Sequence, residues 1–427
     1  MAHRTIKTGY DDLVTRLNKA PQGAPPSLVL NRILAMLMNE KEAGLLALLP
    51  IKPFTAAKAA RIWKIPPAEA RKILEELAGR ALLVDVERHG RSVYTLPPPM
   101  AGFFEFSLMR TRGDLDQKAL SELFHQYLNV EDEFVKALFT GGETQMGRVF
   151  VQEPMLPTDR AAYVLDYERA SEVIRTASHI GVGMCYCRHK KQHLGQACDA
   201  PMDICMTFNG SAESLVKHGH ARAVDRAECG DLLDQAYERG LVQFGENVQQ
   251  RVNFICNCCG CCCEALTAAR TFAHMHPVHT SNYLPVVDHE ACTGCGKCVN
   301  ACPVEALSLV SANDARRPRR RAARLEEDVC LGCGVCVRAC PGRNIALKER
   351  AARVITPVNN AQRYVMMALE RGKLQNLIFD NQILASHRAL AALLGVVLKL
   401  PPVKMALAQK QLKSRFLETV ARQGRGF

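Results

Sequence analysis

Two copies of one cysteine pattern constrain this chain more than any other feature of its sequence. The first copy runs from Cys292 to Pro303 and the second from Cys330 to Pro341. Each reads C-x2-C-x2-C-x3-C-P, with a glycine on either side of its second cysteine. Thiolates with this spacing on a tight loop can hold three corners of one metal–sulfur cube, and the glycines allow the backbone to curl around it. Zinc sites do not usually repeat this spacing with a proline after the fourth cysteine, so the pattern favours two iron–sulfur centres over zinc.

The doubled pattern resembles that of the bacterial dicluster ferredoxins, over about residues 283–350. In that family the fourth cysteine of each run binds the cluster of the other run. The resemblance therefore implies a first [4Fe-4S] cluster held by Cys292, Cys295, Cys298 and Cys340. It implies a second [4Fe-4S] cluster held by Cys330, Cys333, Cys336 and Cys302.

A second group of cysteines occupies residues 185–205, namely Cys185, Cys187, Cys198 and Cys205. On an extended segment Cys185 and Cys187 would point to the same side, so both could reach one metal. Basic residues at 188, 190 and 191 would offset the charge of four thiolates. An iron–sulfur cluster and a zinc site both fit this set, and His189 or His193 could replace one cysteine.

A third group is denser, because six cysteines fall within eight residues: Cys256, Cys258, Cys259, Cys261, Cys262 and Cys263. Adjacent cysteines point in different directions, so they cannot all enter an apolar core. An iron–sulfur site, a metal site shared with residues 185–205, and a redox-active thiol pair all remain open. Any four of the six could be the ligands.

The three cysteine groups together, over about residues 180–345, resemble large ferredoxin-domain proteins of anaerobic bacteria. The resemblance implies electron transfer and leaves the partner open. No G-x-G-x-x-G follows a strand and there is no P-loop, so an electron carrier or oxidoreductase subunit is favoured over a stand-alone enzyme. Two alternatives stay open, a redox-sensing DNA-binding regulator and a reductase with its active site at Cys256–Cys263.

Residues 27–97 resemble a winged helix in the order of their expected elements. Ser27 could cap a helix to Asn39, a short helix and turn follow at 54–66, another helix spans 68–79, and two strands flank His89-Gly90. DNA contact would use seven basic residues, Lys64, Arg71, Lys72, Arg80, Arg88, His89 and Arg91. Three glutamates and the absence of Asn or Gln from the 68–79 helix favour protein contact or a scaffold role over DNA binding.

The net charge of +12 is concentrated in the connection between the two ferredoxin motifs and in the C-terminal tail. The arginines of residues 316–324 predict either a solvated loop or a docking surface for an acidic redox partner. No export signal and no apolar run long enough to span a membrane is recognisable. We therefore expect a cytoplasmic protein whose clustered cysteines hold metal.

These patterns predict an α+β, multidomain protein. Its expected parts are an N-terminal segment or linker (1–26), a winged-helix-like domain (27–97), a mostly helical connection (98–180), a cysteine-rich domain (181–282), a dicluster ferredoxin domain (283–350) and a helical C-terminal region (351–427). The expected cofactors are two [4Fe-4S] clusters, with room for one or two further iron–sulfur clusters or zinc ions. The expected function is passage of single electrons between redox partners.

Overall fold

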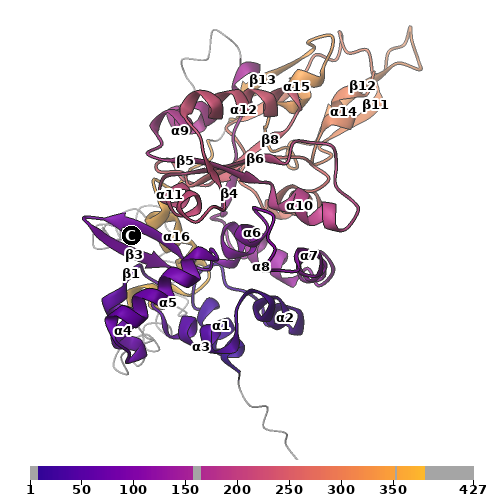
Figure 1. Ribbon diagram of the computed structural model, residues 1–427. Coiled ribbons are helices and arrows are strands. Elements are labelled where there is room, and N and C mark those ends of the chain that lie inside the picture. Colours follow the sequence, from indigo (N-terminus) through magenta and orange to yellow (C-terminus); the bar gives the residue numbers. More distant parts are fainter. Residues whose placement is uncertain (1–7, 157–164, 352, 380–427) are drawn as a thin grey trace, which may run out of the picture. The chain divides into compact units, whose positions relative to one another are not determined.

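The computed structural model describes residues 8–156, 165–351 and 353–379 of the chain (Figure 1). The chain divides into two compact units. The N-terminal unit comprises residues 1–144, 213–221 and 359–427, and the cysteine-rich unit comprises residues 145–212 and 222–358. The chain therefore enters the N-terminal unit three times.

The N-terminal unit is mainly helical. Its elements are α1 (Gly9–Leu17), α2 (Leu28–Leu37), α3 (Glu40–Leu48), β1 (Phe54–Thr55), α4 (Ala56–Trp63), α5 (Pro67–Gly79), β2 (Val84–Arg88), β3 (Arg91–Thr95), α6 (Phe104–Ser107), α7 (Gln117–His125), α8 (Glu133–Thr140), α16 (Asn360–Glu370) and α17 (Leu374–Ile378). The three strands form an antiparallel sheet in the order β1-β3-β2. Helix α11 (Asn209–Lys217) begins in the cysteine-rich unit and ends in this one.

Local sequence accounts for the ends of these elements. The Ser27 hydroxyl accepts a hydrogen bond from the amide of Val29 and so caps α2, and Pro67 occupies the first turn of α5. His89 (φ 51°) and Gly90 (φ 71°) form the two-residue turn between β2 and β3. Both residues of such a turn need positive φ, which is why the predicted hairpin forms here.

Two of the predicted segments differ in extent from the elements and units of the structure. Residues 1–26, predicted to be a linker, contain α1, which a capping box between Thr8 and Asp11 starts and whose Leu13 and Leu17 are buried. The connection predicted at 98–180 is divided, because residues from 145 onward belong to the cysteine-rich unit. Of the predicted helical C-terminal region (351–427), residues 380–427 lie outside the described residues.

The cysteine-rich unit is built on a sheet of six antiparallel strands in the order β4-β8-β9-β6-β5-β7. The elements of this part are β4 (Gly147–Val149), α9 (Ala170–Thr176), β5 (Ile180–Met184), α10 (Tyr186–His193), β6 (Asp203–Phe208), β7 (Arg222–Ala223), α12 (Arg226–Glu238), β8 (Val242–Glu246), β9 (Phe254–Cys258) and α13 (Glu264–Thr271). Helices α9 and α12 pack in one apolar cluster with Met206 of β6 and Ile255 of β9. Because side chains alternate along a strand, Cys205 and Cys256 lie on the opposite face of the sheet.

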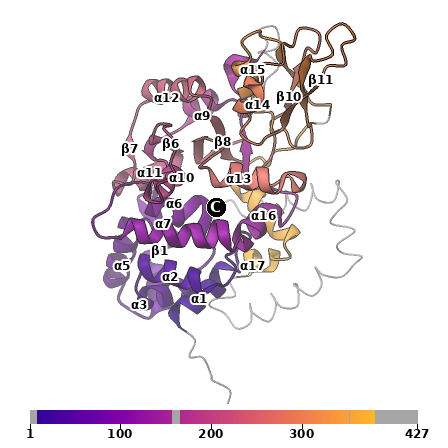
Figure 2. The same ribbon diagram turned by 90° about the vertical axis from the view of Figure 1, so that its right-hand side faces the viewer.

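The same unit ends in a small two-fold repeat, the ferredoxin segment. Its elements are β10 (Tyr283–Val287), α14 (Lys297–Ala301), β11 (Leu307–Ser311), β12 (Arg321–Leu325), α15 (Val335–Ala339) and β13 (Ile345–Glu349). Strand β10 pairs antiparallel with β13, and β11 pairs antiparallel with β12. Figure 2 shows these strands and helices gathered at one end of the unit. Within the described residues, none of the helices has both the length and the apolar character needed to cross a membrane.

Candidate iron–sulfur and metal centres

Each half of the ferredoxin segment encloses a cavity, and the two halves exchange a cysteine. The first cavity is lined by Cys292, Cys295, Cys298 and Cys340, and the second by Cys302, Cys330, Cys333 and Cys336. The exchange arises because Cys302 and Cys340 each sit at the C-terminal end of a five-residue helix, α14 and α15. Each helix therefore carries its last cysteine away from its own loop to the other cavity. Four thiols around each cavity suit an iron–sulfur cluster.

The loops around the cavities depend on glycine. Gly294 (φ +68°) and Gly332 (φ +70°) adopt a left-handed backbone, and an added Cβ would lie 2.4 Å from the Arg321 carbonyl oxygen or 2.2 Å from that of Tyr283. No residue with a side chain fits either position without displacing backbone. The amide of Ala306 donates to Cys302 Sγ (3.2 Å) and the amide of Asn344 donates to Cys340 Sγ (3.4 Å). Such hydrogen bonds stabilise negative charge on the sulfurs.

The two cavities differ in their access to solvent. Cys295 at the first cavity is exposed, and the amide of Lys297 lowers the pKa of its thiol. At the second cavity burial raises the pKa of Cys330 to about 11 and that of Cys333 to about 12. Thiolates at the second cavity are therefore costly unless a bound cation offsets their charge.

The second cavity adjoins the six-stranded sheet. The amide of Gln152, just after β4, donates to the Cys333 carbonyl (3.0 Å). Gly260 makes a second contact with this cavity. A Cβ added to Gly260 would lie 2.8 Å from the carbonyl oxygen of Pro303, which lines the second cavity. The backbone between the crowded cysteines of residues 256–263 thus touches the ferredoxin segment beside Cys302. A glycine between two cysteine pairs was the only sequence signal for this contact.

Residues 291–344 match a family model described as a 4Fe-4S dicluster domain. The match and the two cysteine-lined cavities show an iron–sulfur protein of electron-transfer type. The search of curated proteins and the search of solved structures found no match. The family match covers a minor part of the chain and contains none of the other cysteine groups.

The ten remaining clustered cysteines separate into two thiol groups. The four-thiol group consists of Cys198, Cys259, Cys261 and Cys262, whose sulfurs all lie within 4.8 Å of one another. The six-thiol group is linked through thiol–thiol hydrogen bonds and consists of Cys185, Cys187, Cys205, Cys256, Cys258 and Cys263. Each group draws on both cysteine segments of the sequence, as the shared-site hypothesis allowed.

The six-thiol group lies where β5 and β9 end and β6 begins. Cys185 precedes α10 and Cys187 lies in its first turn, so the extended segment predicted for this pair is wrong. Cys205 Sγ lies 3.6 Å from Cys256 Sγ across the two adjacent strands. Hydrogen bonds with Cys205 and Cys258 hold the pKa of Cys256 well below its usual value. Hydrogen bonds also lower the pKa of Cys263 to about 5, whereas they raise the pKa values of Cys187 and Cys258 well above normal, so thiolate charge is favoured at some members of the group and not at others.

Arg188 lies between the two thiol groups. Its side chain is buried, donates to the carbonyls of Pro201 (2.7 Å) and Asn257 (2.7 Å), and contacts the Cys259 thiol. The neighbouring Lys190 is fully buried and forms an ion pair with Glu264 of α13. Of the predicted charge-balancing residues, Arg188 is therefore beside the thiols and Lys190 is neutralised by a carboxylate. His189 and His193 hydrogen-bond each other (3.1 Å).

The arginine-rich connection forms the turn between β11 and β12. Asp314 pairs with Arg317 (3.1 Å) and with Arg320 (3.2 Å), and Arg320 also donates to the carbonyls of His289 (2.7 Å) and Cys292 (3.3 Å). Arg320 thus stabilises the loop at Cys292 that lines the first cavity. Four other arginines of this hairpin are exposed, Arg316, Arg319, Arg321 and Arg324.

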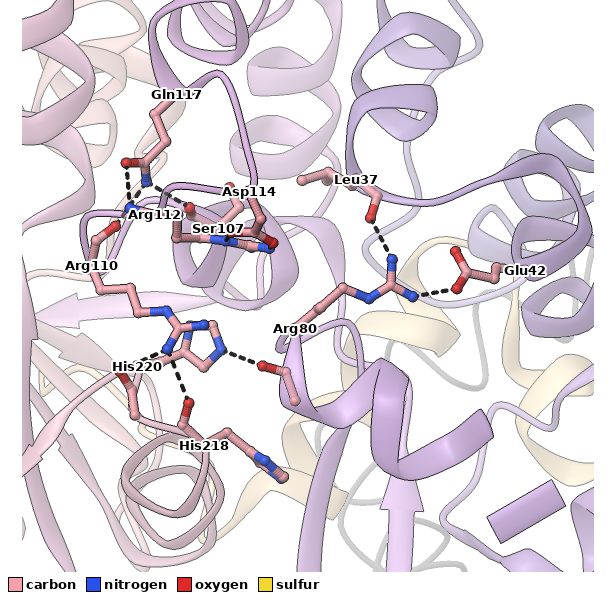
Figure 3. A network of polar contacts seen from close by, with 12 residues as sticks. Leu37, Glu42, Arg80, Ser107, Arg110, Arg112, Asp114, Gln117, His218 and His220 are labelled. Carbon is pink, nitrogen blue, oxygen red and sulfur yellow. Dashed lines mark hydrogen bonds and ion pairs between the residues drawn. The ribbon is translucent and has the colours of Figure 1, made fainter. Parts of the chain in front are cut away.

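Six of the seven basic residues predicted to contact DNA are exposed: Lys64, Arg71, Lys72, Arg88, His89 and Arg91. Arg80 differs, because its guanidinium pairs with Glu42 of α3 and donates to the Leu37 carbonyl (3.4 Å) (Figure 3). Arg80 therefore holds α3 to the end of α5 and is not free to meet a phosphate.

Proposed function

We propose that the chain transfers single electrons through two [4Fe-4S] clusters, the first held by Cys292, Cys295, Cys298 and Cys340 and the second by Cys302, Cys330, Cys333 and Cys336. When bound, each cluster accepts or donates one electron. The main support is the exchange of Cys302 and Cys340 between two cavities that each collect four thiols. The exchange holds the two centres next to each other, as a two-step electron path requires.

The two cavities differ in their access to solvent, and this difference suggests at which end of the electron path a partner protein binds. Exposed Cys295 makes the first centre the place where an external partner would exchange electrons. Residues of the β11–β12 hairpin line this cavity, and the exposed arginines of the same hairpin favour an acidic partner protein. The six-thiol group shares residues 256–263 with the backbone that meets the second cavity at Gly260 and Pro303. Its thiols are linked pair by pair in an extended chain and do not form one compact set of four, and we propose this group as the site of a third iron–sulfur cluster.

Iron and acid-labile sulfide, counted per chain on anaerobically prepared protein, test this proposal. We expect about eight of each from the ferredoxin segment and about twelve if the six-thiol group also holds a cluster. Cys295→Ser and Cys333→Ser should each alter or abolish one component of the EPR spectrum of the reduced protein. Unchanged spectra in both variants would reject the cluster assignment, and eight iron would reject the third cluster.

A second experiment tests whether the exposed arginines bind an acidic partner, and it uses an acidic flavodoxin as electron donor. The rate of reduction should fall steeply as salt is added, because the interaction is between exposed charges. Arg316→Glu with Arg319→Glu should slow the reaction at low salt and flatten its salt dependence. A salt-independent rate would count against an acidic partner.

A redox-sensing regulator is a second candidate, favoured by the contacts of the edge strand β2. The amide of Asp85 donates to Ser214 Oγ (3.1 Å), and the Asp85 carboxylate accepts from Lys217 (2.6 Å) and bonds to His218 (2.9 Å). These partners lie on α11 and just after it, and α11 directly follows β6, which carries Cys205. A change at the six-thiol group could therefore pass along continuous chain to the winged-helix-like segment.

This second candidate predicts DNA binding that differs between cluster-loaded and cluster-free protein. Affinity for a random duplex library should be measured at two salt concentrations, with Lys72→Glu as the test variant and Glu76→Lys as its matched reversal on α5. Lys72→Glu should weaken binding if α5 contacts phosphates. Weak, sequence-blind binding in both cluster states would exclude the regulator.

A further inference from the structure

The four-thiol group has a geometry unlike that of the ferredoxin cavities. Cys198 Sγ lies 3.5 Å from Cys259 Sγ and 3.8 Å from Cys262 Sγ, and Cys261 Sγ lies 3.6 Å from Cys262 Sγ. The four sulfurs form one closed group within 4.8 Å. These distances are well beyond a disulfide bond, whose sulfurs are about 2 Å apart.

Such spacing matches the edges of a tetrahedron around one ion. A zinc–thiolate bond of about 2.3 Å places the four sulfurs of a tetrahedral site about 3.8 Å apart. A cube of iron and sulfide needs thiols that surround a cavity, as the two cysteine sets of the ferredoxin segment do. In the four-thiol group three sulfur pairs are 3.5–3.8 Å apart and all pairs lie within 4.8 Å, so the centre of the group has room for a single ion.

We propose that Cys198, Cys259, Cys261 and Cys262 bind one tetrahedrally coordinated metal ion, zinc or iron without sulfide. This inference goes beyond the electron path of the proposed function and does not depend on it. Binding releases the thiol protons to solvent, since the ligands are thiolates. All four positions are filled by protein ligands, and that is the arrangement of a structural site rather than a catalytic one.

The surroundings fit this role. The ion would join residues 61 positions apart in the chain, the loop after α10 and the segment after β9. The buried guanidinium of Arg188 contacts Cys259 and would offset the excess negative charge of four thiolates on a divalent ion. Gly260, between two of the ligands, lies against Pro303, so the ion would also fix the backbone that touches the ferredoxin segment.

Metal and sulfide analysis of full-length Cys198→Ser, prepared anaerobically, provides the direct test. We expect the variant to lose about one zinc, or one iron without any sulfide, while the remaining iron and sulfide stay unchanged. Cys229→Ser is the matched control, because Cys229 is a buried thiol outside both groups and should leave all counts unchanged. Loss of about four iron together with four sulfide would show a cube at this site and overturn the proposal. Unchanged metal content would overturn it as well.

A second measurement covers the case in which Cys198→Ser fails to fold. Cys261 is exposed, so Cys261→Ser removes a ligand with little cost to packing. Cobalt(II) added to the zinc-depleted full chain should produce the visible absorption of a tetrahedral thiolate complex, read as a difference spectrum against the clusters. Cys261→Ser should shift this band and weaken cobalt binding by at least the roughly tenfold that loss of an outer-shell partner costs, because a direct ligand is lost. An unshifted band, or no band in the unmodified protein, would exclude a tetrahedral site.

Discussion

At the scale of single residues, Arg188 shows how the protein manages buried sulfur charge. Burial by itself lowers the pKa of this guanidinium, but the thiolates of Cys185, Cys259 and Cys258 outweigh burial and raise it. The cation is thus stabilised by the same thiols that it stabilises. Removal of one partner from such an arrangement leaves uncompensated charge in the interior.

Arg188→Met should therefore destabilise the cysteine-rich unit by about 3 kcal/mol or more and lower the metal content of both thiol groups. Arg188→Lys keeps the charge but cannot make both carbonyl bonds, so its effect should be smaller. Arg175→Met is the control, because Arg175 is an exposed arginine on α9 and should leave stability and metal content unchanged. Thermal unfolding measures the stability of each variant, and metal analysis measures its metal content. An unaltered Arg188→Met variant would mean that the thiols carry no buried charge.

At the scale of elements, segment 213–221 is held to the rest of the N-terminal unit by a polar network (Figure 3). Arg110 donates to the carbonyls of His218 (3.2 Å) and Gly219 (3.3 Å), and His220 Nε2 bonds to the Gly79 carbonyl (3.0 Å). The His220 ring is buried and its other nitrogen has no hydrogen-bond partner. Burial lowers the pKa of His220 to about 4, so the ring is neutral at neutral pH.

The stability of the N-terminal unit should therefore fall in mild acid. The unfolded chain takes up a proton at His220 near pH 6.5 and the folded chain only near pH 4, so stability is full above about pH 6.5 and decreases down to about pH 4, by up to roughly 3 kcal/mol. His220→Gln keeps a donor for Gly79 and cannot be protonated, so this part of the pH dependence should disappear.

Urea unfolding at several pH values, followed by tryptophan fluorescence, measures this effect. Trp63 is the only tryptophan of the chain and is buried in α4, so the signal reports on the N-terminal unit. His89→Gln, at the exposed turn between β2 and β3, should keep the pH dependence of the unmodified protein. An identical pH dependence in His220→Gln would show that other groups cause the acid loss.

At the scale of the whole molecule, the two units rely on different interactions. The N-terminal unit has an aromatic core in which Phe104 packs against Phe103, Phe124, Tyr127 and Phe134. The cysteine-rich unit combines the apolar cluster under α9 and α12 with clustered thiols on the other face of its sheet. Clustered thiolates repel one another, so the free energy of metal binding would add directly to the stability of this unit.

Local chemistry was readable from the sequence alone. The ferredoxin repeat could be predicted because its three loop cysteines and their glycines act over a few residues, and the matched family model agrees with it. The hairpin at His89-Gly90 and the cap at Ser27 were predicted for the same reason. Helix α1 was not predicted, because its few buried apolar residues, among them Leu13 and Leu17, are separated by polar residues and give a weak helical pattern.

Only the tertiary structure decided how the other ten cysteines divide. In residues 256–263 six of the eight residues are cysteines, so spacing cannot say which sulfur belongs to which group. The pleat of β9 puts Cys256 and Cys258 on one face of the sheet, where Cys256 meets Cys205 and Cys258 meets Cys263. The turn after β9 places Cys259 and Cys262 beside Cys198. The division of the cysteines depends on the register of the strands and on contact between Cys198 and Cys259, which are 61 residues apart in the chain. Neither is encoded in a local sequence pattern.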